Sequence, residues 1–138
     1  MFFSSIPGLE QFDSDPALLA FVKCHVTSPV KWEVLRTLAN QTGVWIRAEG
    51  LARYTHRQLP EITEALKDLA ADGVVEVLPA AAHEDVSYRL PADEPTSIVL
   101  HRLIEAATHS QEMRAIIALH MQHVRQQSQA LRTSTAAA

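Results

Sequence analysis

One segment near the middle of the chain constrains the fold more than any other. Between residues 59 and 72, apolar side chains recur at steps of three and four, the spacing of one helix face: Leu59, Ile62, Leu66 and Leu69. Asp72-Gly73 then ends this helix with a glycine, which tolerates the backbone of a helix C-terminus. Two β-rich runs follow, 74–78 and 86–90, joined by the loop PAAAHED. We therefore expect a buried helix followed directly by an antiparallel hairpin.

The residues before this segment predict three further helices and a short strand. Asp15-Pro16 begins a helix over 17–26, and Ser28-Pro29 supplies the cap and first residue of a helix over 30–40. Residues 44–46 are β-prone, and residues 47–54 are predicted to form a brief helix buried through Leu51 and Ala52.

The residues after the hairpin predict two more helices. Pro91 and Pro95 bracket a linker, helices follow over 97–107 and 111–127, and Thr108 to Ser110 is a candidate break between them. The last residues form either a frayed helix end or a disordered tail. The expected organisation has four parts: an N-terminal arm and helix (1–27), a central module (28–91), a C-terminal helical region (92–131) and a tail (132–138).

The order of elements over 28–91 resembles the winged helix-turn-helix superfamily, and in particular bacterial arsenic-responsive and antibiotic-resistance repressors (ArsR- and MarR-like). Three residues carry the likeness. Ala52 is small where the first helix of the motif packs closely against the second, and Ile62 is aliphatic ten positions later. His56 falls at the turn, where the backbone is often left-handed and Gly is preferred. The resemblance implies a mainly α fold with a small antiparallel hairpin, an extra N-terminal helix and C-terminal dimerisation helices.

The same resemblance implies a homodimeric, DNA-binding transcription regulator whose second motif helix contacts the major groove of double-stranded DNA. Side chains suited to base edges lie at and after the turn, and cations suited to phosphates flank them. The predicted DNA-binding residues are Arg47, Arg53, Thr55, His56, Arg57, Gln58, Thr63, Lys67 and Arg89.

The charge of the chain favours an alternative partner. The net charge is −4, and the predicted recognition helix carries Glu61, Glu64 and Asp68, which a phosphate backbone repels. Pro60 also leaves that helix without a Ser, Thr or Asp cap at its immediate start. A winged helix that binds a protein through the acidic face of 58–68, and not DNA, therefore remains an alternative.

The C-terminal helices carry an apolar stripe that needs a partner. That partner is the core of the protein, the N-terminal helix or the same helices of a second chain, and we favour the homodimer. The predicted dimerisation residues are Leu100, Leu103, Ile104, Ile117, Met121 and Val124.

The histidines raise a third hypothesis, a metal-sensing repressor. His109, His120 and His123 have a spacing similar to that of zinc-sensing repressors, but Ala107 occupies the position of the aspartate ligand. Ordinary solvated or half-buried histidines explain the pattern better, so we predict neither a metal site nor a cofactor.

No motif of an enzyme is present: there is no phosphate-binding glycine loop, nucleophile elbow or convincing carboxylate pair. Cys24 is the only cysteine, which rules out an intrachain disulfide, and no apolar run has the length of a membrane span. We expect a cytoplasmic protein that is not an enzyme and has no membrane partner.

Overall fold

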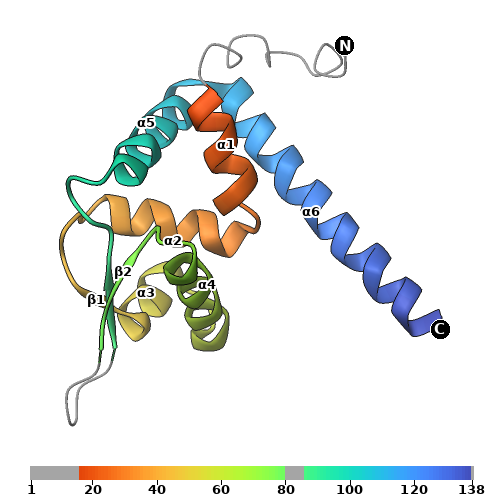
Figure 1. Cartoon of the computed structure of the whole chain (residues 1–138), viewed down its shortest axis with the longest axis horizontal. Coiled ribbons are helices and arrows are strands. Elements are labelled where there is room, and N and C mark those ends of the chain that lie inside the picture. The colour runs from red at the N-terminus through yellow and green to blue at the C-terminus, as the bar shows by residue number, and fades with distance from the viewer. Residues whose placement is uncertain (1–15, 80–85, 138) are drawn as a thin grey trace.

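A computed structural model describes residues 16–79 and 86–137, with side chains up to residue 129. Helices and strands follow one another in the order seen in Figure 1. The elements are α1 (Pro16–His25), α2 (Pro29–Ala39), β1 (Ile46–Arg47), α3 (Ala48–Thr55), α4 (Leu59–Ala71), β2 (Glu76–Leu78), β3 (Ser87–Arg89), α5 (Pro95–His109) and α6 (Gln111–Ala137). Each helix and strand expected from the sequence is present and begins within two residues of its predicted start. Most ends agree as closely, and α6 runs on through the predicted tail.

Local signals explain where the helices begin and end. The Ser28 side chain accepts a hydrogen bond from the Lys31 backbone N–H at 3.2 Å, and Pro29 occupies the first turn of α2, as predicted. Gly73 follows α4 with a left-handed backbone, φ 78°. The predicted cap Asp15 lies outside the described residues.

The core is one continuous cluster that runs from α1 to α6. Val34, Leu35 and Leu38 of α2 are fully buried at its centre, where α2 packs against α3, α4 and α5. The N-terminal helix, the central module and the C-terminal helices therefore share one hydrophobic core.

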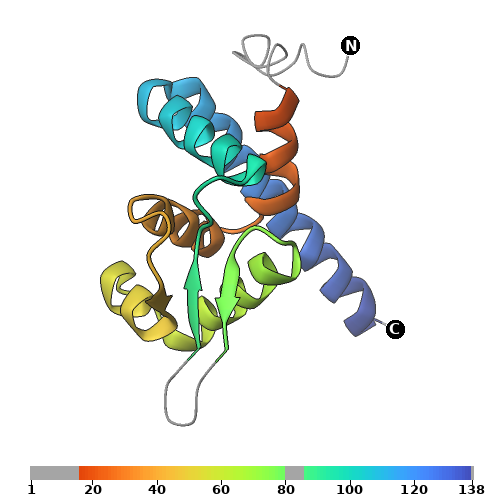
Figure 2. The same cartoon turned by 60° about the vertical axis from the view of Figure 1, so that its left-hand side comes forward.

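The predicted hairpin is confirmed, and a third strand joins it. The sheet is antiparallel in the order β1-β3-β2, with Tyr88 of β3 opposite Ile46 of β1 and opposite Val77 of β2. The short β-prone run before α3 thus ties the start of the motif to the hairpin, which Figure 2 shows beside α3 and α4. The loop residues 80–85 lie outside the described part of the chain.

For three of the six predicted dimerisation residues, burial in the C-terminal helices contradicts the prediction. Leu100, Leu103 and Ile117 are at most 2% exposed, because α5 and α6 pack against each other and against α1. These three side chains fill the core of their own chain and are not available to a second copy, contrary to the prediction. Ile104 and Met121 are only partly buried, as is Val124, so their role at a dimer interface stays a prediction.

Helix α6 extends well beyond the rest of the molecule. Figures 1 and 2 both show its C-terminal half projecting away from the other helices. The tail predicted as either frayed helix or disordered continues this helix to Ala137. None of the described helices combines the length and the hydropathy needed to cross a membrane.

Candidate nucleic-acid interface

The turn between α3 and α4 has the left-handed residue that the sequence predicts. His56 has φ 57° and ψ 38°, and it is the one non-glycine residue with positive φ in the described chain. The next backbone N–H, that of Arg57, donates to the Ala52 carbonyl at 3.1 Å, which closes the end of α3. Ile62 is fully buried and Ala52 partly buried where the two helices meet. The helix-turn-helix therefore packs as expected.

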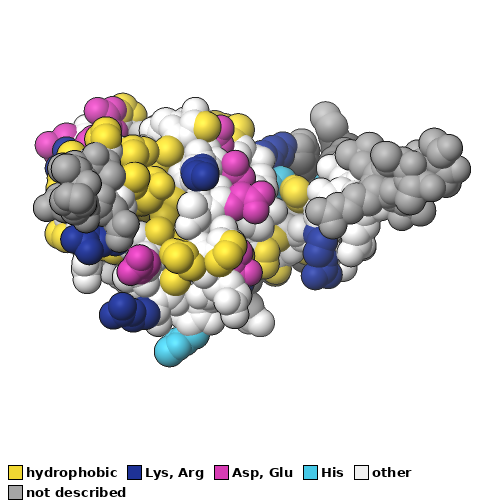
Figure 3. Space-filling model, turned by 90° about the horizontal axis from the view of Figure 1, so that it is seen from below, with side chains coloured by type: hydrophobic (Ala, Val, Ile, Leu, Met, Phe, Trp, Pro, Cys, Tyr) yellow, Lys and Arg dark blue, Asp and Glu magenta, His cyan; other side chains and the backbone are white. Residues whose placement is uncertain are grey.

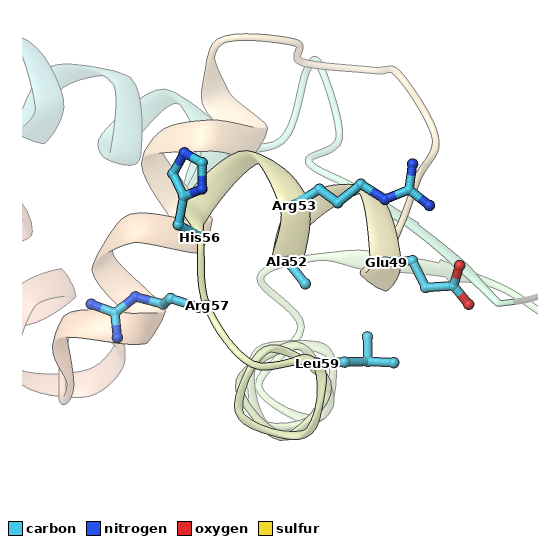
Figure 4. Close-up of a pocket in the computed structure, with 6 residues that line it drawn as sticks. All are labelled: Glu49, Ala52, Arg53, His56, Arg57 and Leu59. Carbon is cyan, nitrogen blue, oxygen red and sulfur yellow. The ribbon is translucent and has the colours of Figure 1, made fainter.

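The apolar stripe of α4 is confirmed at three positions and wrong at the fourth. Ile62, Leu66 and Leu69 are fully buried, whereas Leu59 is 41% exposed. Leu59 is the first residue of α4, and Figure 4 shows its side chain directed away from the helix axis, on the side where Glu49 lies. Helical spacing alone does not show that Leu59, the first residue of the stripe, lies outside the core.

The outward face of α4 is mixed in charge and open to solvent. Glu64 and Lys67 are exposed, and Gln58 is exposed at the N-cap without forming a side-chain cap. Asp68 forms an ion pair with Lys31 of α2 at 3.5 Å. The Thr63 hydroxyl donates to the Leu59 carbonyl of its own helix at 2.9 Å, so it must give up that bond to contact a base.

Arg57 is held by acidic partners within the chain. Its guanidinium donates to Glu33 of α2 at 2.5 Å and lies 3.5 Å from Glu61 of α4. The hydrogen bond and charge of Glu33 raise the pKa of Arg57, ahead of the contribution of Glu61. This pair ties the turn to α2. The predicted contact between Arg57 and a base therefore competes with an ion pair whose partners are each 29% exposed.

Arg89 is engaged in the same way at the base of the hairpin. Its guanidinium forms an ion pair with Glu76 on the neighbouring strand at 2.9 Å and lies 4.4 Å from the ring centre of Trp45. The sequence predicts a phosphate contact for this residue, but in the structure it joins β3 to β2 and to Trp45, the residue before β1.

The side chain of Thr55 faces its own chain and is not available to DNA in this structure, contrary to the prediction. It is 9% exposed at the end of α3, and its hydroxyl donates to the Leu51 carbonyl at 2.7 Å. Its residue type suits a base edge, but its position directs it into the protein.

Three of the predicted cations remain available for a partner. Arg47, Arg53 and Lys67 are exposed and form no ion pair with any residue in 16–79 or 86–129. Figure 3 views the end of the molecule that carries α3 and α4, where Lys and Arg side chains are separated by acidic and hydrophobic ones. The basic residues do not gather into one continuous patch on this view.

A shallow, open groove lies between α3 and the start of α4 (Figure 4). It is lined by Glu49, Ala52, Arg53, His56, Arg57 and Leu59. Ala52 and Leu59 form its apolar part, and Arg53 and Glu49 extend from α3 on the same side in the close-up. Arg57 points the other way, toward the helix that carries its partner Glu33. The groove thus places an apolar surface beside a cation, Arg53, and an acid, Glu49.

The C-terminal histidines lie in two different helices. His109 ends α5, whereas His120 and His123 belong to α6, because the chain breaks at Ser110 as predicted. Within the described residues, no three His, Cys, Asp or Glu side chains are close enough to hold a metal ion. The Nε2 atom of His120 is buried without a hydrogen-bond partner in the described chain, and burial lowers the pKa of this residue.

Two features of the site were not found from the sequence: the partner of Arg57 and the exposure of Leu59. Glu33 lies 24 positions before Arg57, and no local pattern links the two. Leu59 could have been found: the proline after it marks it as the first residue of a helix, where a side chain lies at the edge of the core.

Comparison with known proteins supports the fold. Neither the protein-family models nor the curated proteins provide a match to this chain. Among solved structures, the transcriptional repressor BigR from Xylella fastidiosa is similar, with a TM-score of 0.51 and 19% sequence identity over 74% of this chain and 97% of that one. The helix-turn-helix, the hairpin behind it and this likeness agree. The chain has a mostly helical winged helix-turn-helix fold with a small antiparallel sheet.

Proposed function

We propose that the protein is a winged-helix transcription regulator that binds double-stranded DNA as a homodimer. The observation that carries the proposal is the accessible outer face of α4. One side of this helix packs against α2 and α3, while Glu64 and Lys67 on the other side are exposed. A recognition helix needs this arrangement to enter the major groove. The similar structure BigR is a transcriptional repressor, which supports the proposal by analogy.

The charges of the site predict modest affinity with a moderate salt dependence. Arg47, Arg53 and Lys67 are the predicted cations without an ion pair in the described chain, while Arg57 and Arg89 are paired with acids. The logarithm of the binding constant falls with the logarithm of salt concentration by about 0.9 for each phosphate neutralised. Three such contacts in each protomer therefore give a slope of about −5 for a dimer.

The test is selection of DNA from a random-sequence library, followed by fluorescence anisotropy with the selected duplexes over a range of salt. Glu64→Lys is the informative variant, because Glu64 is exposed and forms no ion pair with a described residue. Glu61 is less suitable because it contacts Arg57. We expect Glu64→Lys to tighten binding several-fold at low salt, since it replaces a repelled charge with an attracted one.

The matched control is Glu105→Lys, which makes the same change in net charge at an exposed position of α5. Figure 1 shows α5 away from α3 and α4. Its effect on DNA binding should be small. A folded wild-type protein that selects no sequence and binds no duplex at low salt would contradict the proposed function.

The acidic surface of α4 favours a second candidate, a winged helix that binds another protein. Glu61, Glu64 and Asp68 lie along one helix and would suit a basic partner. Under this alternative, Glu64→Lys weakens binding to the partner and creates no sequence-selective binding to DNA. The same variant therefore separates the two functions.

We place the homodimer contact on the exposed part of α6. Met121 packs partly against the core of its own chain, but Val124 is only partly buried and Leu119 is 50% exposed. An amphipathic helix in this position needs a cover, and a second copy would also bring two recognition helices to successive turns of DNA.

Light scattering coupled to size-exclusion chromatography tests the dimer. The wild type should elute with twice the protomer mass. Val124→Asp, which buries a charge if the contact forms, should shift the mass toward that of the protomer. Gln126→Asp, at an exposed position of the same helix, should remain dimeric. A monomeric wild type at high micromolar concentration would contradict the dimer and leave the fold unaffected.

The proposal places the protein in the cytoplasm, where a regulator of this kind meets DNA. It assigns the protein neither enzymatic activity nor a metal or cofactor.

A further inference from the structure

Leu59 is exposed at a position where an aliphatic side chain contributes little to the core. It is 41% exposed, while the three other apolar residues of its stripe are fully buried. It begins α4, the helix that the fold presents outward. The exposed part of this side chain gains no free energy from its own protein and would gain it from a ligand, since burial is worth about 25 cal/mol per Å².

The neighbours of Leu59 limit what that ligand can be. Ala52 lies beside it in the groove, and the two give a small apolar surface without a deep cavity. Arg53 extends from the same helix turn as Ala52, is exposed and has no ion pair with a described residue. Glu49 also lines the groove, on the same side as Arg53. The surface therefore suits a small apolar group attached to a molecule whose negative charge lies at Arg53 and away from Glu49.

Thymine in duplex DNA has this chemistry. Its C5-methyl group is the apolar feature of the four bases in the major groove, and phosphates lie on either side of the groove. The N-terminal residues of a recognition helix are the ones that contact base edges. Leu59 is the first residue of that helix.

We propose that Leu59 is a specificity-determining residue that contacts the C5-methyl group of a thymine, with Ala52 behind it and Arg53 on a nearby phosphate. This inference rests on the proposed DNA-binding function and adds a base preference to it. Leu59 offers no hydrogen bond to a base, so its contribution is selectivity for thymine over bases that lack the methyl group.

The experiment uses the full-length protein and the duplexes that the wild type selects from a random library. Each thymine of the selected sequence is replaced in turn by uracil, which removes the methyl group and keeps the base pair. At one position in each half-site, we expect the wild type to lose about fourfold in affinity, the equivalent of about 0.8 kcal/mol for one buried methyl group.

Two variants test whether Leu59 causes this loss of affinity. In Leu59→Ala, thymine and uracil duplexes should bind equally well at that position. Ile98→Ala is the control: Ile98 is 54% exposed on α5, and its variant should keep the fourfold difference. Circular dichroism and thermal unfolding establish that both variants are folded.

The outcomes separate the inference from the function on which it rests. If the wild type binds selected DNA but no thymine-to-uracil change matters, or if the difference persists in Leu59→Ala, the inference is wrong and the proposed function stands. A selected sequence that contains no thymine would also refute the inference and leave the proposed function standing. If the folded protein binds no DNA and Leu59→Ala instead weakens binding to a protein, both are wrong and the groove docks an apolar side chain.

Discussion

Replacing His56 by glycine should stabilise the protein, although it removes a whole side chain. His56 has φ 57° in the turn between α3 and α4. A residue with a Cβ atom pays about 1–2 kcal/mol for a left-handed backbone, whereas glycine adopts it without steric strain. The imidazole is exposed and forms no hydrogen bond with a described residue, so its loss costs little.

The net effect is smaller than the strain, because glycine also loses more backbone entropy on folding. That loss is about 0.4–1 kcal/mol, which leaves a gain of about 0.5–1 kcal/mol for His56→Gly. With about 2.1 cal/mol/K of unfolding entropy per residue and 138 residues, the gain corresponds to a rise in melting temperature of about 2–3 °C.

Differential scanning calorimetry measures this shift in melting temperature, and two further variants serve as controls. His56→Ala keeps a Cβ atom and should bring no gain. Gly73 has φ 78°, and a Cβ atom added there would meet nothing within 4 Å. Gly73→Ala therefore tests backbone strain alone and should lower stability by about 1 kcal/mol. If Gly73→Ala destabilises as expected but His56→Gly lowers the melting temperature too, the backbone at His56 is not left-handed.

Two further predictions concern ionisable groups. The first is the half-buried pair of Arg57 and Glu33. In a double-mutant cycle with Arg57→Ala and Glu33→Gln, measured by urea unfolding, this pair should show a coupling free energy of about 1 kcal/mol. Additive effects of the two substitutions on the free energy of unfolding would refute the link between the turn and α2. Burial, with smaller contributions from His123 and Lys23, lowers the pKa of His120 below 6.5, despite an opposing hydrogen bond with the Lys23 backbone. The unfolded chain therefore takes up this proton first, so the stabilisation is present above about pH 6.5 and is lost as pH falls through the pKa of the folded state. Between about pH 7.5 and about pH 5, His120→Gln should lose less stability than the wild type in thermal unfolding, and equal losses would show that His120 is not the group responsible.

Most of the fold could be predicted because local signals are strong. Ser28-Pro29 fixes the start of α2, and Asp72-Gly73 fixes the end of α4, through capping interactions that depend on a few adjacent residues. Apolar residues at helical spacing mark the buried faces for the same reason. The C-terminal stripe was found equally well, but spacing does not identify the partner. Leu100 and Ile117 turned out to face their own chain.

The candidate site was predicted less well, because its side chains depend on neighbours far away in the sequence. Thr55, Arg57 and Arg89 have residue types that suit DNA, yet one is buried and the other two are paired with acids. Arg57 meets Glu33 through the packing of α4 on α2, and Arg89 meets Glu76 through strand register. Residue type predicts what a side chain can bind, but tertiary contacts decide whether it is available.

The ion pairs of Arg57 and Arg89 have a consequence for how such a regulator would locate its target in a cell. Cations that neutralise phosphates supply nearly all of the affinity for random sequence, and a chromosome presents roughly a million or more competing sites. With two arginines held by Glu33 and Glu76, bulk chromosome would retain fewer copies of the protein than if both arginines were free. A larger share of the protein would then diffuse freely, and a promoter could be occupied at a lower copy number.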